Sequence, residues 1–292
     1  MTNGRLPDLI GLGARRCGTS WLHRCLNEHP RIGKTKDGLH FFSDHFDRGP
    51  EWYLDQLAPY ADSPVVLDLS VSYSYPHQCD QVAARIAAAA PDVKLFIAVR
   101  DPVERAFSDY RRSISRLEID KTLSFEEALE RHPVFIERGL YARIIDAYLA
   151  HFPPDRLLVL FFEDLERDPA AYMRPLFEFM GVEADLDLPA LGRKGESAKA
   201  IRSETYQRVL FGAKDRAQRL ASGLGLEDPW EKVKERFMWM YQKAIAANAV
   251  ESDIPARVRR KVVRRFEQDL KRLAIITGRN LDHYLAPDKG RG

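Results

Sequence analysis

The sequence has few of the features that mark secreted, membrane-spanning or metal-binding proteins. It contains only three cysteines in 292 residues, Cys17, Cys25 and Cys79, and their spacing fits no metal-binding motif. An odd number of cysteines argues against a disulfide framework, so we expect free thiols. The first residues do not form a secretory signal, and no apolar run approaches the length of a membrane span. The sequence therefore predicts a cytoplasmic protein without a membrane partner.

The chain also lacks an excess of charge of either sign. It carries 45 Lys and Arg residues against 43 Asp and Glu residues, which gives a formal net charge of +2. Such a balance provides no bulk attraction to nucleic acid, so no nucleic-acid partner is expected. We find neither internal repeats nor a low-complexity linker. We therefore expect a single domain over residues 1–292, with its core at roughly 7–190 and a loop and helical region at roughly 191–285.

Short apolar runs alternate with segments of helical periodicity. The runs at residues 9–12, 65–69, 95–99 and 156–165 are typical of buried strands. This alternation predicts an α/β fold in which helices cover both faces of a central parallel sheet, followed by a helical C-terminal part. Ligands of such sheets bind at the carboxyl ends of the strands.

A loop with glycine at each end, from Gly13 to Gly18, follows the first apolar run. The helix after it begins at Thr19. Backbone N–H groups of such a loop and the positive end of the helix point at one spot, which favours a phosphate. The spacing resembles the nucleoside-triphosphate loop GxxxxGK[ST], but Thr19 stands in place of the lysine and the loop carries its cation at Arg16. The missing lysine argues against hydrolysis of ATP or GTP.

A second candidate anion site follows the apolar run at 95–99. Arg100 stands at the end of that run, and Asp101 with Pro102 is typical of a helix start. Ser108 lies eight residues after Arg100, two turns into the expected helix. We therefore expect the guanidinium and the hydroxyl to converge on one anion.

Together the two motifs resemble those of sulfotransferases that use 3′-phosphoadenosine 5′-phosphosulfate (PAPS). The first matches their 5′-phosphosulfate loop, a Lys or Arg, one residue, then Gly-Thr-Thr/Ser. The second matches their 3′-phosphate element, Arg-Asn/Asp-Pro-x-x-Arg-x-x-Ser, whose second arginine is Arg105 here. The pattern is most similar to bacterial members and to the heparan sulfate N- and O-sulfotransferase group.

The resemblance implies a P-loop-like three-layer sandwich and an enzyme. Its reaction is the in-line transfer of a sulfonate group from PAPS to an acceptor hydroxyl or amine, without a metal. The product of the donor is then adenosine 3′,5′-bisphosphate. The implied acceptor is a small molecule or a saccharide, and the oligomeric state is not predicted.

The resemblance also implies the residues that bind the cofactor. Arg16 neutralises charge on the departing phosphate, and the indole of Trp21 stacks on adenine, with packing in the core as the alternative. A basic loop at 191–197 resembles the family's loop over the nucleotide, although a solvated loop is the alternative. The expected set is Arg15, Arg16, Cys17, Gly18, Thr19, Ser20, Trp21, Arg100, Ser108, Arg193, Lys194 and Gly195.

The catalytic base is less well defined. The family reads Lys-Glu-x-x-Phe-Phe, with the glutamate as base, whereas this chain has one more residue between Lys36-Asp37 and the two phenylalanines. Direct alignment puts Gly38 at the base position. Asp37 is our first candidate, or else a loop carboxylate. His40 competes with it because histidine titrates near neutrality. Asp68, at the end of a strand, is the third candidate, or else caps a turn.

Two other functions compete with sulfonate transfer. A P-loop nucleotide kinase is disfavoured by the missing lysine and the lack of a magnesium-binding acidic pair. A non-catalytic protein on the same fold would bind a polyanion through the last, basic helix, near residues 252–273. A metal site from His40, Asp44 and His45 matches no familiar spacing, so no metal is expected.

Overall fold

The computed structural model describes residues 4–35, 37–120, 122–184, 188–192, 200–201, 249–250 and 254–286. The chain divides into two compact units. The first comprises Met1–Ala106, Pro133–Glu196 and Ala256–Gly292, and the second comprises Phe107–His132 and Ser197–Pro255. We describe each unit by itself, and the single domain expected from the sequence stays a prediction.

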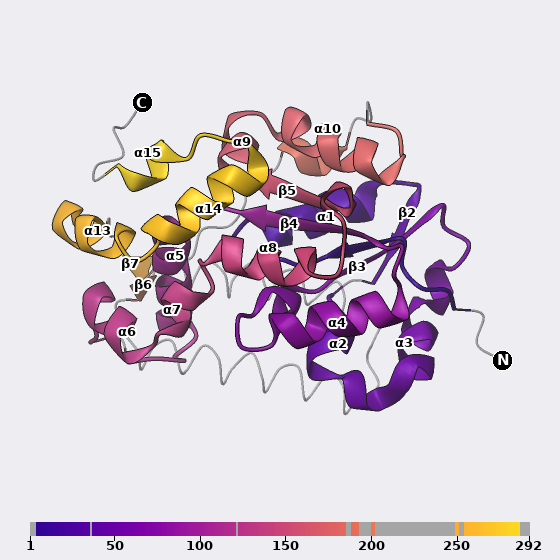
Figure 1. The fold of residues 1–292 in the computed structure, drawn as a ribbon, viewed down its shortest axis with the longest axis horizontal. Coiled ribbons are helices and arrows are strands. Elements are labelled where there is room, and N and C mark those ends of the chain that lie inside the picture. The colour runs from indigo at the N-terminus through magenta and orange to yellow at the C-terminus, as the bar shows by residue number, and fades with distance from the viewer. Residues whose placement is uncertain are drawn as a thin grey trace, which may run out of the picture. The chain divides into compact units, whose positions relative to one another are not determined.

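The first unit is built on a five-stranded parallel sheet with strand order β2-β3-β1-β4-β5 (Figure 1). Leu9 of the central strand pairs with Leu67 on one side and with Lys94 on the other. This arrangement confirms the central parallel sheet flanked by helices. The strands are β1 (Leu9–Gly11), β2 (Ile32–Lys34), β3 (Val65–Leu69), β4 (Lys94–Val99) and β5 (Leu157–Phe161). The short edge strand β2 was not among the expected strands.

Burial explains why these segments form strands. Residues 95–99 of β4 have no exposed surface, and all five residues of β3 are buried. A strand covered on both faces reads as a continuous apolar run, which the sequence shows at both places. Asp68 of β3 is the exception to this apolar pattern.

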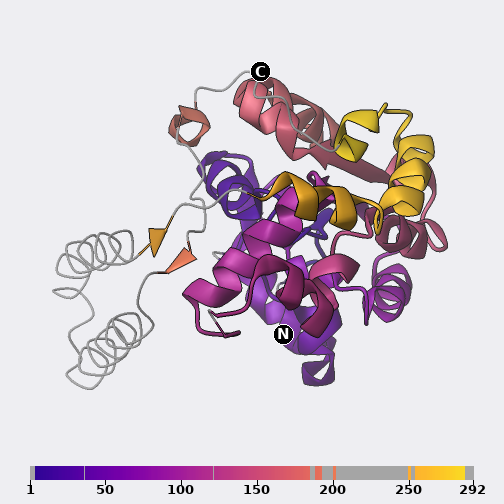
Figure 2. The ribbon, with the colours of Figure 1, turned by 90° about the vertical axis from the view of Figure 1, so that its left-hand side faces the viewer.

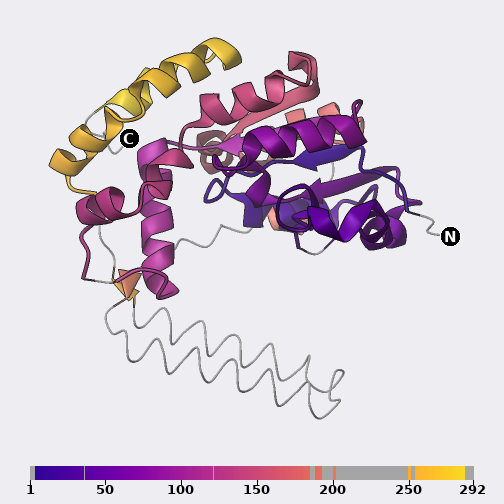
Figure 3. The ribbon, with the colours of Figure 1, turned by 60° about the horizontal axis from the view of Figure 1, so that its bottom comes forward.

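Helices cover both faces of the sheet. Helices α1 and α10 pack on one side, where Trp21 meets Tyr172, while α4, α8 and α14 pack one against the next on the other (Figure 3). Right-handed crossovers between parallel strands require this distribution. The helices of this unit include α1 (Thr19–Glu28), α2 (Phe41–Asp44), α3 (Gly49–Leu57), α4 (Cys79–Ala89), α7 (Val134–Glu137), α8 (Tyr141–Leu149), α9 (Phe162–Arg167), α10 (Pro169–Met180), α13 (Ala256–Val263), α14 (Glu267–Thr277) and α15 (Asp282–Leu285).

Five short 3-10 turns connect these elements. They are η1 (Phe46–Arg48), η2 (Ala58–Tyr60), η3 (Val71–Ser74), η4 (Pro154–Arg156) and η5 (Pro189–Gly192). The turn η3 follows β3 directly, so it lies at the carboxyl edge of the sheet, where ligands of this architecture bind.

The second unit contains α6 (Phe125–Arg131) and most of α5 (Pro102–Ser115), which begins in the first unit. Ser124 and Glu127 form a capping box at the start of α6, and Tyr110 donates from its hydroxyl to Leu123 O at 2.7 Å. Strands β6 (Ala200–Ile201) and β7 (Ala249–Val250) pair antiparallel (Figure 2).

None of the helices within the described ranges combines the length and the apolar character that crossing a bilayer requires.

Candidate active site

The loop after β1 begins as an extension of that strand. Leu12 N–H donates to Phe96 O at 2.8 Å, Ala98 N–H to Gly13 O at 2.7 Å, and Ala14 N–H to Ala98 O at 2.9 Å. These bonds hold the first half of the loop against β4 as far as Ala98. The loop therefore reaches the carboxyl edge of the sheet beside the end of β4.

The second half of the loop turns into the start of α1. Gly18 has φ of 84° and Arg16 has φ of 73°, a left-handed conformation that residues other than glycine rarely adopt. No side chain caps α1, and its first turn contains no acidic residue. The first N–H groups of a helix lack acceptors within the helix and carry partial positive charge. An anion such as a 5′-phosphate fits this helix start.

Phe162 joins the loop to the second anion element. The guanidinium of Arg100 lies over the Phe162 ring, 4.7 Å from its centroid. A Cβ added to Gly18 would lie 3.0 Å from the same ring. One aromatic side chain thus contacts both, so Arg100 lies beside the loop after β1.

At the end of β3, Asp68 is completely buried among hydroxyl groups. Its Oδ2 accepts from Tyr53 at 3.0 Å and from Tyr73 at 2.7 Å, and its Oδ1 accepts from Ser70 Oγ at 2.6 Å. Burial, together with the Asp68 charge, raises the pKa of Tyr53 and Tyr73 well above the usual value. A carboxylate surrounded by donors in the core is suited to anchoring the turn after β3.

His40 is attached to the same edge through two serines. Its backbone N–H donates to Ser70 Oγ at 2.9 Å, and Ser70 N–H donates to Gly11 O of β1 at 3.0 Å. Its ring Nδ1 lies 2.6 Å from Ser72 Oγ, which in turn lies 2.6 Å from Ser43 Oγ. The side chain is half-buried and the backbone is left-handed, with φ of 53°.

The residues just before His40 differ from the family pattern for a steric reason. A Cβ on Gly38 would lie 2.7 Å from Leu69 O and 3.0 Å from Ser70 Cα. The position that direct alignment matches to the glutamate therefore has no room for a side chain. Asp37 is exposed, and its carbonyl accepts from Thr35 Oγ1 at 2.5 Å.

Comparison with known proteins identifies the family of this chain. Residues 6–210 match the family described as sulfotransferase domain. The chain belongs to this family. It is 31% identical over 186 residues to human heparan sulfate glucosamine 3-O-sulfotransferase 3B1, a match that covers 61% of this chain and 47% of that protein. It is 28% identical over 200 residues to human bifunctional heparan sulfate N-deacetylase/N-sulfotransferase 3, covering 62% and 23%.

A solved structure shares the fold over nearly the whole chain. The sulfotransferase from Alicyclobacillus acidocaldarius superposes with a TM-score of 0.69 at 23% identity, covering 97% of this chain and all of that one. The matched part of this chain spans about half the length of the 3-O-sulfotransferase relatives.

Two residues of the predicted cofactor set, Cys17 in the loop and Trp21 in the first turn of α1, have buried side chains. Cys17 is fully buried, its Sγ lies 3.4 Å from Tyr141 OH, and burial raises its pKa to about 11. Trp21 is only 3% exposed and packs edge-on against Tyr172, with ring centroids 6.0 Å apart. For Trp21, this geometry favours packing in the core over stacking on adenine. For Cys17, only the backbone is available to contact a ligand.

The other residues of the second motif have separate environments. Asp101 Oδ1 accepts from Val103 N–H at 2.9 Å and from Glu104 N–H at 3.1 Å, so it caps α5 as expected. Arg105 is fully buried and donates to Phe135 O. Ser108 is half-buried on α5 and belongs to the second unit, so its part in binding stays a prediction. Arg193, Lys194 and Gly195 lie outside the described residues.

Sequence reasoning missed two ionisable residues near the base candidates. Lys34, at the end of β2, is 4% exposed, and burial lowers its pKa to about 8. His23 of α1 is half-buried; burial lowers its pKa to about 4, and the charge of Lys34 acts in the same direction. A charged residue at the end of a strand would have pointed to Lys34. The sequence analysis did not predict β2, so this signal was not available.

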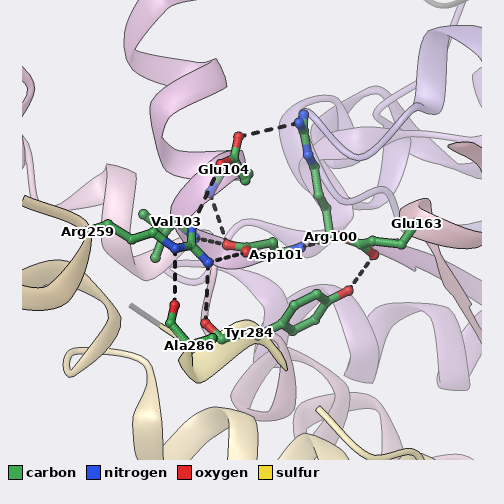
Figure 4. A network of polar contacts seen from close by, with 8 residues as sticks. All are labelled: Arg100, Asp101, Val103, Glu104, Glu163, Arg259, Tyr284 and Ala286. Atoms are coloured by element: carbon green, nitrogen blue, oxygen red, sulfur yellow. Dashed lines mark hydrogen bonds and ion pairs between the residues drawn. The ribbon is translucent and has the colours of Figure 1, made fainter. Parts of the chain in front are cut away.

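Arg259 was also missed, because it is one of many cations in the last, basic helix. Its side chain is 5% exposed, and its Nη2 donates to Asp101 Oδ2 at 2.6 Å (Figure 4). Asp101 N–H donates to Glu163, whose other oxygen accepts from Tyr284 OH. The C-terminal helices are thus tied to the residue that follows Arg100.

Two further features bear on where a ligand binds. In the described ranges, no group of three or more His, Cys, Asp or Glu side chains is placed to hold a metal ion. A cleft lined by Pro7, Asp8 and Lys94 lies at the amino ends of the strands. It is on the opposite edge from the loop, so we do not assign the nucleotide to it.

Proposed function

We propose that this sulfotransferase domain transfers a sulfonate group from PAPS to a hydroxyl or amine of an acceptor. The observation that carries the proposal is the shared contact of Phe162 with Gly18 and Arg100. It places a helix start suited to one phosphate beside a cation suited to another. The donor carries phosphate at two ends, which matches two adjacent anion sites. A kinase is not favoured, because Thr19 stands where the loop lysine would be.

The residues of this chain have distinct tasks in donor binding. The N–H groups of Gly18, Thr19 and Ser20 bind the 5′-phosphate, and Arg100 binds the 3′-phosphate. PAPS, when bound, supplies an activated sulfonate on a phosphate leaving group. The guanidinium of Arg16 stabilises the charge that grows on that phosphate, the role that preorganised cations serve best. Ser108, Arg193, Lys194 and Gly195 complete the proposed site from the sequence.

We assign the general base to His40 in preference to Asp37. The contact of Nδ1 with Ser72 Oγ at 2.6 Å fixes the ring and leaves Nε2 to take the acceptor proton. Asp37 is exposed, and although its charge acts on Lys34 and His23, its carboxylate accepts no hydrogen bond from the described residues. Asp68 is surrounded by three hydroxyl donors, so we assign it a structural role.

For the acceptor, we propose a saccharide as the first class to screen, because the names of the relatives specify heparan sulfate glucosamine. Small-molecule hydroxyls form the second class, since enzymes that share one fold can act on different acceptors. A cytoplasmic location remains the expectation from the sequence, and cell fractionation tests it.

The test is calorimetric titration with adenosine 3′,5′-bisphosphate, with AMP, and with ATP and magnesium. We expect the bisphosphate to bind at least about tenfold more tightly than AMP, because charge-assisted bonds to the 3′-phosphate contribute about 1.5–3 kcal/mol. Arg100→Ala should remove that preference and leave AMP binding intact. Preference for ATP would replace the proposal by the kinase. If none of the three nucleotides binds, the result would favour a non-catalytic polyanion-binding protein.

A further inference from the structure

Glu104 lies between two guanidinium groups in the first turn of α5. Its Oε2 is 3.7 Å from Arg100 Nη2, and its Oε1 is 3.7 Å from Arg259 Nη1 (Figure 4). Neither distance is short enough for a strong hydrogen bond. The carboxylate, 28% exposed, is therefore shared between the two cations without being committed to either.

Arg259 is held in place by its other atoms. Its Nη2 donates to Asp101 Oδ2 at 2.6 Å, and its Nε donates to Ala286 O at 3.3 Å. Its Nη1 is buried and has no hydrogen-bond partner. A buried donor without an acceptor is costly, so Nη1 would gain from a closer carboxylate. The carboxylate that faces it is Glu104.

Arg100, unlike Arg259, is open to solvent on one side. Its side chain is 20% exposed, and it stands at the end of β4 beside the loop after β1. A phosphate that reaches Arg100 must compete with the negative charge of Glu104 for the same guanidinium. The two anions also repel each other, so binding is easiest when the carboxylate turns away.

We propose that Glu104 and Arg259 are positioning residues that set how strongly Arg100 binds the 3′-phosphate. Without nucleotide, Glu104 shares its charge with Arg100. When the 3′-phosphate binds, the carboxylate moves to Nη1 of Arg259 and satisfies that donor. This inference rests on the proposed function, because it takes Arg100 as the 3′-phosphate ligand. It links the C-terminal helix α13 to donor recognition.

The test is Glu104→Gln, measured by titration with adenosine 3′,5′-bisphosphate and with AMP. Removal of the competing charge should tighten bisphosphate binding about two- to fivefold, the range of a partly exposed ion pair, and leave AMP binding unchanged. A purely structural role of Glu104 would not change the ratio of the two affinities. The matched control is Glu267→Gln, which removes the carboxylate of another i,i+4 pair, with Lys271 at 2.6 Å. It should leave both affinities unchanged.

A double-mutant cycle tests the part of Arg259. Arg259→Lys should weaken bisphosphate binding while Glu104 is present, and should have no such effect in the Glu104→Gln background. Equal effects in both backgrounds would overturn the role of Arg259, and an unchanged affinity ratio in Glu104→Gln would overturn the role of Glu104. The proposed function fails separately, if the unmodified protein does not prefer bisphosphate over AMP or if Arg100→Ala keeps that preference.

Discussion

The donor side and the acceptor side of the candidate site are held by different kinds of interaction. The loop after β1 is fixed through backbone hydrogen bonds to β4, and the sequence from Arg16 to Ser20 matches the family motif at each position. The segment from Asp37 to His40 depends on side chains, namely the hydroxyls of Ser70 and Ser72. A phosphate needs N–H groups, which backbone geometry supplies with little choice of residue, and a cation, which one arginine side chain supplies. An acceptor needs a shaped surface and a base, which different side chains can supply.

One feature is common to the two sides. Among the described residues, three non-glycine residues have positive φ, namely Arg16, His40 and Leu117. Two of the three are candidate site residues, one on each side. Such conformations are costly and persist where the surrounding structure imposes them, often at functional sites. The left-handed backbone conformation thus occurs at one candidate residue on each side, Arg16 on the donor side and His40 on the acceptor side.

The largest effect is expected on the acceptor side, from loss of the base. If His40 is the base, as we propose, His40→Ala should lower turnover about 10²- to 10⁴-fold, the range for a general base. Bisphosphate affinity should stay within about twofold of the unmodified protein, since the donor side is held independently. Initial rates of sulfonate transfer, measured beside calorimetry, separate the two quantities.

Asp37→Asn is the matched variant for this prediction. We expect it to keep most of the turnover, because the carboxylate is exposed and not oriented by the described residues. If Asp37→Asn is the inactive variant and His40→Ala stays active, the base is Asp37. If both variants lose donor affinity as well, the two sides are not independent and the comparison fails.

A smaller effect is expected from filling the space at Gly38. In Gly38→Ala the new Cβ would meet Leu69 O at 2.7 Å, so the segment before His40 must shift. We expect a loss of about 1–3 kcal/mol in the free energy of unfolding, the usual cost of overpacking. The measurement is urea denaturation. The matched control is Gly192→Ala, where nothing lies within 4 Å, and its change should stay within about 0.5 kcal/mol.

Gly38→Ala should also separate donor binding from turnover. Because Gly38 packs on the end of β3 and not on the loop, bisphosphate affinity should survive while turnover falls. A variant as stable and as active as the unmodified protein would show that the segment tolerates a side chain. The family glutamate could then be restored at this position.

Much of the donor side could be predicted from the sequence because its signals are local. The Gly13–Gly18 loop and the Arg100-Asp101-Pro102 element are contiguous motifs, and the structure brings them together. The side chain of Trp21 could not be placed this way, because its packing depends on Tyr172 from a distant helix. The sequence favours Asp37 as the base, whereas our proposal of His40 rests on contacts to Ser70 and Ser72 that cross about thirty residues of chain and leave no local pattern. Which residue is the base stays a prediction.

Arg259 shows the same limit at the C-terminus. Its helix carries several arginines, and the spacing alone does not tell which one turns inward. That choice is made by Asp101, 158 residues away in the chain, whose carboxylate accepts from Arg259. A buried carboxylate such as that of Asp101 needs a cation beside it. Only the fold determines which arginine of the helix lies at that position.

An effect of about the same size as that of Gly38→Ala is expected from His23 of α1, whose pKa also responds to the charges of Lys34, Asp37 and His40. Burial lowers the pKa of His23 to about 4. Between pH 6.5 and 4 the unfolded chain binds a proton that the folded chain does not, so the free energy of unfolding falls as pH falls, by up to ~1.4 kcal/mol per unit. His23→Phe should lose this part of the slope in urea denaturation at pH 7, 6 and 5. His151→Phe, at an exposed site, should keep it. Parallel slopes for both variants would mean that His23 is solvated when folded, and that the space between α1 and β2 is open to water on the acceptor side.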